Sequence, residues 1–292
     1  MSFWTKLEKT IQCHQSLLCV GLDPYPERIP DRYTSVADFN KAIIDATADL
    51  ACVYKPNIAF YEALGPAGLE ALRQTLDHIP DEIPVLLDAK RGDIASTASA
   101  YATAAFEVWG VDALTVNPYL GWDGVRPFME HPGKGIFLLC KTSNPSAGQI
   151  QDWCQGDEPL YLHIARLAAS WAEQGEIGLV VGATYPEALA QIRAESPRIW
   201  FLVPGVGAQG GELEAALAAG LRPDGMGMLI NASRGILYAD DPRAAALELR
   251  DDINEARAHV GAMAQAKPAT ALPAYKQALA QLLFEAGCVR CG

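Results

Sequence analysis

The chain has 292 residues, half of them hydrophobic and a fifth charged, a globular composition that excludes an intrinsically disordered protein. Its 23 basic and 35 acidic residues give a net charge of −12, which argues against nucleic acid or an anionic membrane as a partner, because such partners select basic surfaces. A small anionic substrate stays possible, since local charge can oppose the net charge.

We expect no targeting segment and a cytoplasmic location. Residues 1–15 are mixed and polar, and the apolar run 17–22 is too short for a signal peptide or a membrane span. Seven cysteines, an odd number, predict reduced thiols rather than a disulfide framework. Cys288 and Cys291 are interpreted as two surface thiols; the alternative is a redox or metal role, with His259 the nearest further ligand in sequence.

Short apolar runs recur along the chain and predict strands buried on both faces of a parallel sheet. In chain order they are Leu17–Asp23, Ala51–Asn57, Pro84–Lys90, Ala113–Pro118, Gly135–Lys141, Ile177–Thr184, Ile199–Val206 and Gly225–Ala232. Amphipathic segments between them predict helices at Val36–Leu50, Gly68–His78, Ala95–Trp109, Leu160–Gln174, Pro186–Ala194 and Glu212–Ala219.

Repeated strand–helix units predict an α/β fold, a (β/α)8 TIM barrel with additional terminal helices, formed as a single domain over residues 1–292. Residues 240–292 are predicted to be helical, with a proline-containing break near 267–273. The alternative is a doubly wound open sheet. It would show a G-x-G-x-x-G motif after the first strand, where this chain has Val20–Pro24 instead.

Polar residues collect at the carboxyl ends of the predicted strands, where the active sites of barrels lie. They are Asp23, Lys55, Asn57, Asp88, Lys90, Arg91, Asp93, Asn117, Lys141, Thr142, Ser143, Asn144, Asn231, Ser233 and Arg234. Any one of them taken alone is most simply a solvated strand end or a helix cap. Together they would be costly to desolvate unless they are paired, so a functional site explains the set better.

Asp88 and Lys90 carry the sharpest chemistry. Residues i and i+2 of a strand share a face, so both side chains are predicted to point into the barrel mouth, with Lys55 on the neighbouring strand and Asp93 just beyond. Alternating Lys and Asp side chains can all stay charged and can stabilise charge that develops in a reaction. The alternative is a purely structural ion-pair network.

The glycine-rich stretch 204–211 and Arg234 predict an anion site, because loops after the last two strands of a barrel commonly bind phosphate. A tight turn is the alternative for the glycines. The scattered histidines form no metal-binding pattern, and no nucleophile elbow or Walker-type loop is present.

The run Leu87–Ile94 resembles the D-x-K-x-x-D signature of the orotidine 5′-phosphate decarboxylases, in the D-A-K-R-G-D-I form of a bacterial subgroup. Further segments are similar to the same subgroup: Gly21–Pro24, Tyr54–Asn57, Asn117–Gly121, Lys141–Pro145 and Pro204–Gly211. The resemblance spans residues 17–236. It implies a homodimeric (β/α)8 barrel that converts orotidine 5′-phosphate to UMP and CO2 in de novo pyrimidine biosynthesis, without cofactor or metal.

By motif position, the resemblance implies the catalytic residues Lys55, Asp88, Lys90 and Asp93. Lys90 would protonate C6 of the pyrimidine, Asp88 would lie against the departing carboxylate, and Asp93 would reach the partner subunit's site. The implied substrate-binding residues are Asp23, Lys55, Thr97, Asn117, Ser143, Pro204, Gln209, Gly210 and Arg234.

Within that set, Asp23 and Lys55 would hold ribose hydroxyls, with Thr97 contributed by the partner, and Gln209 and Arg234 would bind the phosphate. Ser143 would contact the pyrimidine amide edge, with Thr142 as the alternative. Residues 146–159 are long enough to form a lid, which stays a hypothesis.

Three rival functions share part of this pattern. Metal-dependent barrel aldolases and decarboxylases of sugar phosphates share the D-x-K-x-x-D element, but an acidic metal ligand is expected on the second strand, where this chain has Lys55. An aldolase that forms a Schiff base through a lysine is a variant of this alternative. A non-catalytic nucleotide-binding barrel would keep the phosphate loop without needing Asp88 and Lys90 on one face.

Overall fold

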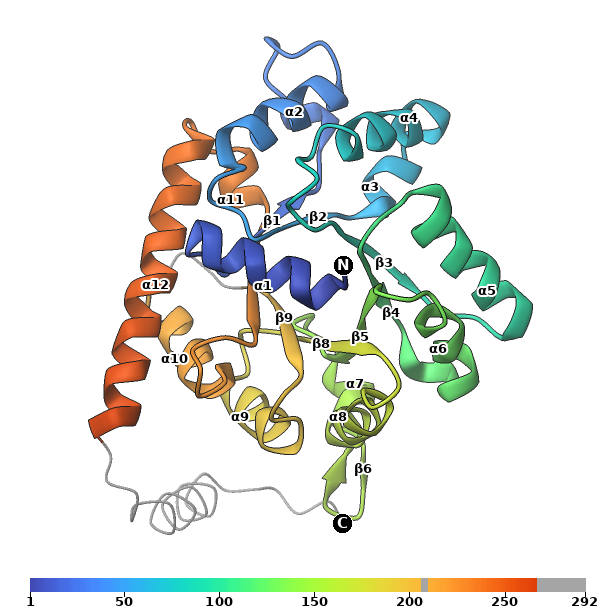
Figure 1. The fold of residues 1–292 in the computed structure, drawn as a ribbon, viewed down its shortest axis with the longest axis vertical. Helices are drawn as coiled ribbons and strands as arrows, with labels where there is room; N and C mark the ends of the chain where they lie inside the picture. The colour runs from blue at the N-terminus through green and yellow to red at the C-terminus, as the bar shows by residue number, and fades with distance from the viewer. Residues whose placement is uncertain (206–209, 267–292) are drawn as a thin grey trace.

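Eight parallel strands form the centre of the molecule, with helices around them (Figure 1). The computed structural model describes residues 1–205 and 210–266. The strands are β1 (Leu18–Leu22), β2 (Val53–Pro56), β3 (Leu86–Arg91), β4 (Ala113–Val116), β5 (Gly135–Lys141), β8 (Glu176–Val181), β9 (Trp200–Pro204) and β10 (Met228–Ala232). Each overlaps a predicted strand, so the predicted strand series is confirmed.

The strands follow the order β2-β1-β10-β9-β8-β5-β4-β3. Parallel bridges from Tyr54 to Val85 and from Asn57 to Asp88 join β2 to β3 and close the ring. Closure distinguishes the barrel from the doubly wound alternative, which keeps two open sheet edges. The predicted TIM-barrel fold is therefore confirmed.

The helices that cover the barrel include all those predicted, with shifted ends. They are α2 (Val36–Thr47), α3 (Ile58–Glu62), α4 (Gly65–Leu76), α5 (Ala95–Thr103), α6 (Trp122–Met129), α7 (Gly148–Gln151), α8 (Leu160–Trp171), α9 (Pro186–Glu195), α10 (Gly210–Gly220), α11 (Arg234–Leu237) and α12 (Pro242–Ala266). Helix α5 continues as a π-helical turn over Ala104–Val108. Helix α6 was not predicted, because Gly124 and Pro127 are weak helix formers. Burial of Val125 and Phe128 holds that helix against the barrel.

The predicted helical C-terminal region is confirmed over α12. The break expected near residues 267–273, and Cys288 and Cys291, lie outside the described residues. His259 lies on α12 with an exposed side chain.

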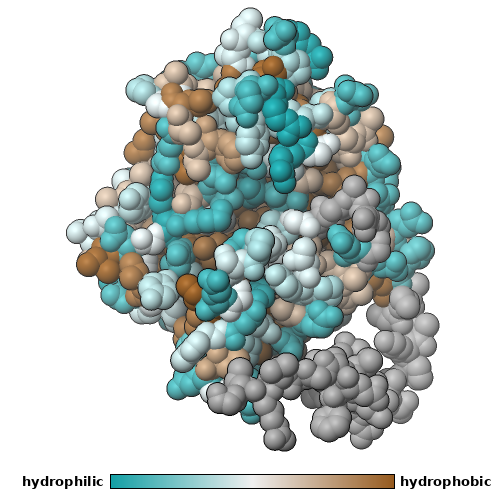
Figure 2. All heavy atoms as spheres, turned by 180° about the vertical axis from the view of Figure 1, so that it is seen from behind, coloured by the Kyte–Doolittle hydropathy of each residue, from teal (hydrophilic) through white to brown (hydrophobic). Residues whose placement is uncertain are grey.

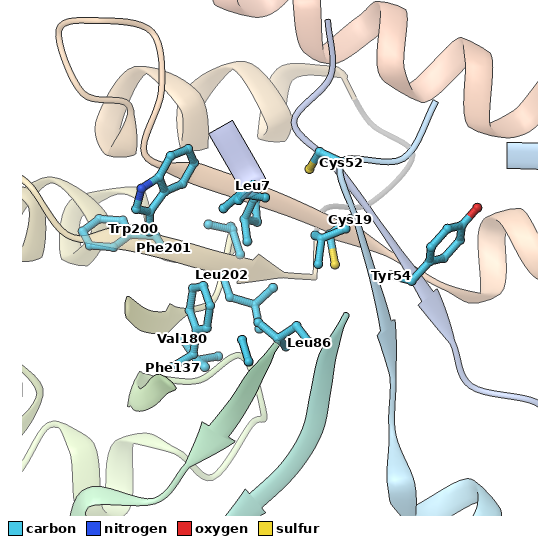
Figure 3. Close-up of a cluster of buried hydrophobic side chains, with 14 of the residues drawn as sticks. Leu7, Cys19, Cys52, Tyr54, Leu86, Phe137, Val180, Trp200, Phe201 and Leu202 are labelled. Atoms are coloured by element: carbon cyan, nitrogen blue, oxygen red, sulfur yellow. The ribbon is translucent and has the colours of Figure 1, made fainter. Parts of the chain in front are cut away.

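Helix α1 (Phe3–His14) lies across one end of the ring of strands (Figure 1). Phe3, Leu7 and Ile11 recur every fourth residue and are at most 2% exposed, so one face of the helix is buried. The Phe3 ring meets the Phe137 ring edge-on with centroids 6.0 Å apart, and it fills the space that a side chain at Gly135 would need. Leu7 joins Trp200 and Leu202 in the cluster at this end of the barrel (Figure 3).

The contacts of α1 are with the amino-terminal parts of the strands, so the helix closes that end of the barrel and leaves the other end open. Seen from the opposite side, hydrophilic side chains occupy the middle of the face (Figure 2). None of the helices within 1–205 and 210–266 is long and apolar enough to cross a membrane.

Because Phe3 plugs the closed end of the barrel, we expect Phe3→Ala to lower the free energy of unfolding by about 3 kcal/mol, through lost burial and the cavity that remains. Chemical denaturation measures this. Gln12→Ala, an exposed position on the same helix, should change the unfolding free energy by less than about 0.5 kcal/mol. Equal effects of the two substitutions would contradict a plug role for Phe3.

Candidate active site at the barrel mouth

Three charged side chains from β2 and β3 meet at the open end of the barrel. Lys55 and Asp88 are 4% and 8% exposed, and the Lys55 Nζ lies 3.2 Å from the Asp88 Oδ2. The Lys90 Nζ lies 2.6 Å from the Asp88 Oδ1. One buried carboxylate is thus held between two ammonium groups, so the structure brings these three predicted residues together.

The backbone of β3 does not run as the regular strand that the i, i+2 argument assumed. Its pairing with β4 shifts register between Leu87 and Arg91, and Lys90 has a φ of 46°, in the left-handed region that a lysine rarely adopts. Lys90 still reaches Asp88, but through this bulge rather than through simple alternation.

Thr115 on β4 holds the bulge in place. Its Oγ1 accepts hydrogen bonds from the backbone N–H groups of Ala89 and Lys90, both at 2.9 Å, and donates to the Asp88 Oδ1 at 2.9 Å. The sequence analysis missed this residue. The available signal was a single hydroxyl in the otherwise apolar strand Ala113–Val116, where a buried polar group requires partners.

Electrostatics keep the buried pair charged. Burial alone would raise the pKa of Asp88, but the charges of Lys55 and Lys90 and the hydrogen bonds from Lys90 and Thr115 outweigh it and lower this pKa to about 2. Burial likewise disfavours the Lys55 ammonium, yet the carboxylates of Asp23 and Asp88 hold the pKa of Lys55 above its ordinary value. At neutral pH the mouth therefore contains an ionised Asp88 beside a cationic Lys55.

Asp23 and Arg234 come from opposite ends of the sequence and line one cavity of about 600 Å³. Asn231, Ser233 and Gly205 also line it, as do the acidic residues Glu248 and Asp252 of α12. The Oδ1 atom of Asp23 is buried without a hydrogen-bond partner among the described residues, whereas Arg234 is exposed. The cavity thus offers an acceptor and a cation to a ligand that carries hydroxyls and negative charge.

Asp93 is not part of the Lys55–Asp88–Lys90 array in this chain. It is half-buried in the loop between β3 and α5, its Oδ1 accepts from the Ile94 N–H at 2.8 Å, and it forms no ion pair with any described residue. Thr97 is exposed on α5.

The loop after β5 separates the roles of Thr142 and Ser143. The Thr142 hydroxyl donates to the Asn144 Oδ1 at 2.6 Å and accepts from the Gln151 Nε2 at 2.7 Å, so its one proton is already used. Ser143 is exposed, and its hydroxyl makes no hydrogen bond to the described residues. Lys141 is 3% exposed and pairs with Asp152.

The remaining candidate residues are placed as follows. Asn117 is exposed, and its Oδ1 accepts from the Tyr119 N–H at 3.0 Å, closing the turn Pro118–Leu120. Pro204 ends β9 and Gly210 begins α10, whereas Gln209 lies outside the described residues. Across residues 1–205 and 210–266, no group of three or more His, Cys, Asp or Glu side chains is arranged to hold a metal ion.

Comparison with known proteins gives one consistent family. Residues 16–249 match the model described as the orotidine 5′-phosphate decarboxylase / HUMPS family. The chain is 51% identical over 278 residues to the orotidine 5′-phosphate decarboxylase of Thermomicrobium roseum, covering 90% of this chain and 99% of that relative. It is 49% identical over 273 residues to the protein of the same name from Azoarcus sp., covering 88% of this chain and 100% of the relative.

Solved structures agree with the sequence relatives. The OMP decarboxylase of Leishmania donovani is 48% identical with a TM-score of 0.81, and the match covers 88% of this chain and 99% of that one. The UMP synthase of Leishmania donovani is 50% identical with a TM-score of 0.82, and the match covers 88% of this chain and 57% of that longer one.

The low pKa of Asp88 predicts a pH-dependent contribution to stability. A carboxyl group whose pKa falls from 3.8 to about 2 on folding stabilises the native state above pH 4 by about 2 kcal/mol, and this stabilisation is lost as the pH falls through 2. The free energy of unfolding of Asp88→Asn should therefore fall less steeply between pH 5 and pH 2 than that of the wild type. Asp31→Asn, at an exposed carboxylate, serves as the control; an Asp88→Asn protein with the wild-type slope would refute the assignment.

Proposed function

This chain belongs to the orotidine 5′-phosphate decarboxylase family and is a carboxy-lyase that converts orotidine 5′-phosphate to UMP and CO2 in pyrimidine biosynthesis, and we propose that this reaction takes place at the mouth of its barrel. The observation that carries the proposal is the Asp88 carboxylate held between Lys55 and Lys90 at the open end of the barrel. A purely structural ion-pair network would not require a cation as exposed as Lys90 at the open end of the barrel.

Lys90 is the proton donor in this proposal. Its side chain is 48% exposed, whereas that of Lys55 is 4% exposed, so Lys90 can face a ligand while Lys55 supports Asp88 from below. As the bond from C6 to the carboxylate breaks, CO2 leaves and the electron pair stays on C6. A proton then moves from the Lys90 Nζ to C6, and water reprotonates the lysine.

The electron pair on C6 lies in the plane of the ring and cannot delocalise into the π system, so fixed charges must supply most of the stabilisation. The Lys90 ammonium supplies that charge, and Thr115 fixes the backbone that carries it. Asp88 keeps its negative charge beside the departing carboxylate because two cations lower its pKa. The repulsion between the two carboxylates is relieved when CO2 leaves.

The phosphoribosyl part of the substrate fits the cavity that Asp23 and Arg234 share. Asp23 has an unpartnered carboxylate oxygen to accept from a ribose hydroxyl, with Lys55 beside it, and Arg234 supplies a cation for the phosphate, together with Gln209 and Gly210. Binding energy from the phosphate then aligns the distant pyrimidine for reaction.

For the pyrimidine, we assign the amide-edge contact to Ser143 rather than Thr142, because the Thr142 hydroxyl is already engaged on both sides by Asn144 and Gln151. Asn117 and Pro204, at the ends of β4 and β9, complete the rim that contacts the substrate.

A homodimer in which Asp93 and Thr97 reach the partner subunit's site is part of the proposal. Two observations support this dimer. Asp93 forms no ion pair with the described residues of its own chain, and an exposed apolar surface lies next to it. The exposed fractions there are 58% for Ile94, 81% for Tyr119 and 43% for Leu120. Gly124 packs between Leu120 and the Asp93 backbone, which makes this surface continuous with the Asp93 loop.

We further propose that the enzyme works in the cytoplasm without cofactor or metal and that residues 1–292 are one domain. The metal-dependent aldolase alternative requires an acidic metal ligand at the position of Lys55. The Schiff-base aldolase alternative requires a lysine with a neutral amine. The raised pKa of the buried Lys55 opposes a Schiff-base role for this lysine.

Residues 146–159 remain a proposed lid: they form α7 and a hairpin of β6 (Cys154–Gln155) and β7 (Glu158–Pro159), with Trp153 65% exposed.

Lys90→Ala should abolish turnover while UMP still binds, because the substitution removes the proton donor but leaves the phosphate and ribose contacts. The assay follows the loss of orotidine 5′-phosphate absorbance with purified, metal-stripped protein, and UMP affinity is measured by calorimetry. Near-normal turnover of Lys90→Ala would refute the mechanism, and a wild-type enzyme that loses activity on metal stripping would favour the metal-dependent alternative.

The shared site makes a separate prediction for mixed subunits. Inactive Lys90→Ala and Asp93→Ala chains should regain about a quarter of wild-type activity when mixed, since half of the random dimers are mixed and each mixed dimer has one intact site. If Asp93 acted within its own chain, neither site of a mixed dimer would be intact. Confirmed mixed dimers without activity would therefore exclude action across the interface.

A further inference from the structure

Ser233, at the end of β10, projects into the barrel directly over Gly21 of β1. The parallel pairing of Val20 with Ala232 brings these two residues opposite each other. A Cβ atom added to Gly21 would lie 2.7 Å from the Ser233 Cβ, closer than atoms in contact can approach, and 3.2 Å from its Oγ, a tight contact. The space that a side chain of residue 21 would occupy is therefore filled by Ser233.

The Ser233 hydroxyl has no hydrogen-bond partner within residues 1–205 and 210–266. Its Oγ atom is buried, and it makes no hydrogen bond to any residue that the structure describes. Serine before a helix commonly caps the helix with its side chain, but here the side chain makes no capping bond to α11, and only the Ser233 carbonyl accepts, from Ile236 and Leu237. A buried hydroxyl without a partner is rare, and a bound ligand is one of the few explanations.

The location of this hydroxyl indicates which ligand group it meets. One layer deeper in the barrel, the Cys19 Sγ donates to the Asn231 Oδ1 at 3.4 Å, so Asn231 is already engaged. Ser233 lies above that pair and lines the same cavity as Asp23 and Arg234. Lys55 is paired with Gly21 on the other side of β1, which brings the catalytic lysine to the same level of the barrel.

Two unpartnered buried atoms thus share one cavity, and their chemistry is complementary. The Asp23 Oδ1 can only accept a hydrogen bond, whereas the Ser233 Oγ can donate one. A phosphoribosyl group satisfies both, because its ribose hydroxyls donate and its ester and phosphate oxygens accept.

We propose that Ser233 is a further substrate-binding residue, whose hydroxyl donates a hydrogen bond to an oxygen of the phosphoribosyl group between Asp23 and Arg234. The inference rests on the proposed site at the barrel mouth. The absence of a side chain at Gly21 then leaves room for this hydroxyl beside Lys55.

Ser233→Ala tests the hydrogen bond directly. The dissociation constants of UMP and of ribose 5-phosphate should both rise about five- to tenfold, the loss expected for one neutral hydrogen bond. KM should rise by a similar factor and kcat should change less, because the contact is made in the ground state as well. The melting temperature should not fall, since the hydroxyl bonds to no group of the residues that the structure describes. Unchanged affinity for both ligands would overturn the proposal.

A second pair of variants separates the hydroxyl from its packing role. Gly21→Ala should lower the melting temperature because its methyl group collides with Ser233. Adding Ser233→Gly makes room for that methyl group, so the double variant should recover its melting temperature but bind UMP no better than Ser233→Ala does. A double variant with wild-type UMP affinity would show that only space matters at this position.

The proposed site itself is tested by the wild-type enzyme. Failure of the wild type to bind UMP, or retention of UMP affinity after Arg234→Ala together with Asp23→Ala, would reject the site. Wild-type binding that depends on Arg234 and Asp23 but not on Ser233 would reject only the inference about Ser233.

Discussion

The buried carboxylate of Asp88, held between two ammonium groups, is the interaction on which the rest of the site depends. A charge at 8% exposure is tolerated only with close opposite charges and hydrogen bonds, and Lys55, Lys90 and Thr115 supply them. The same contacts set the geometry of the proposed reaction site. The bulge that Thr115 stabilises brings the Lys90 ammonium to the carboxylate, so one arrangement both satisfies the buried charge and orients the proposed proton donor.

The ion pairs around Asp88 require a barrel interior that water can enter from one end only. Helix α1 closes the amino-terminal end of the barrel with Phe3 and Leu7, and beneath the charges the interior is filled by side chains such as Cys19, Phe137 and Leu202 (Figure 3). In this poorly polarisable surrounding each ion pair is stronger than in water, and the fixed charges need not reorganise during the reaction.

The net charge of −12 describes the molecule as a whole and not its site. Lys55, Lys90 and Arg234 contribute positive charge around the mouth, whereas the charge of Lys141 is paired with Asp152. An acidic protein can in this way offer cations at its barrel mouth, although the cavity that Arg234 lines also carries the carboxylates of Asp23, Glu248 and Asp252. Asp23 adds an acceptor for hydroxyl groups, and Ser233 adds a donor, so the cavity is suited to a phosphoribosyl group rather than to a bare anion.

The sequence by itself determined the strand series, the barrel and the set of polar residues at its mouth, because apolar runs of strand length and the D-x-K-x-x-D spacing depend on local order along the chain. Only the tertiary structure decided which of these residues meet. It placed Thr115 under the bulge, turned Lys141 towards Asp152, left Asp93 outside its own chain's array and set Ser233 over Gly21. The physical reason is that these contacts join different strands, and their geometry follows from barrel closure, register shifts and backbone φ angles, none of which a local pattern of residues specifies.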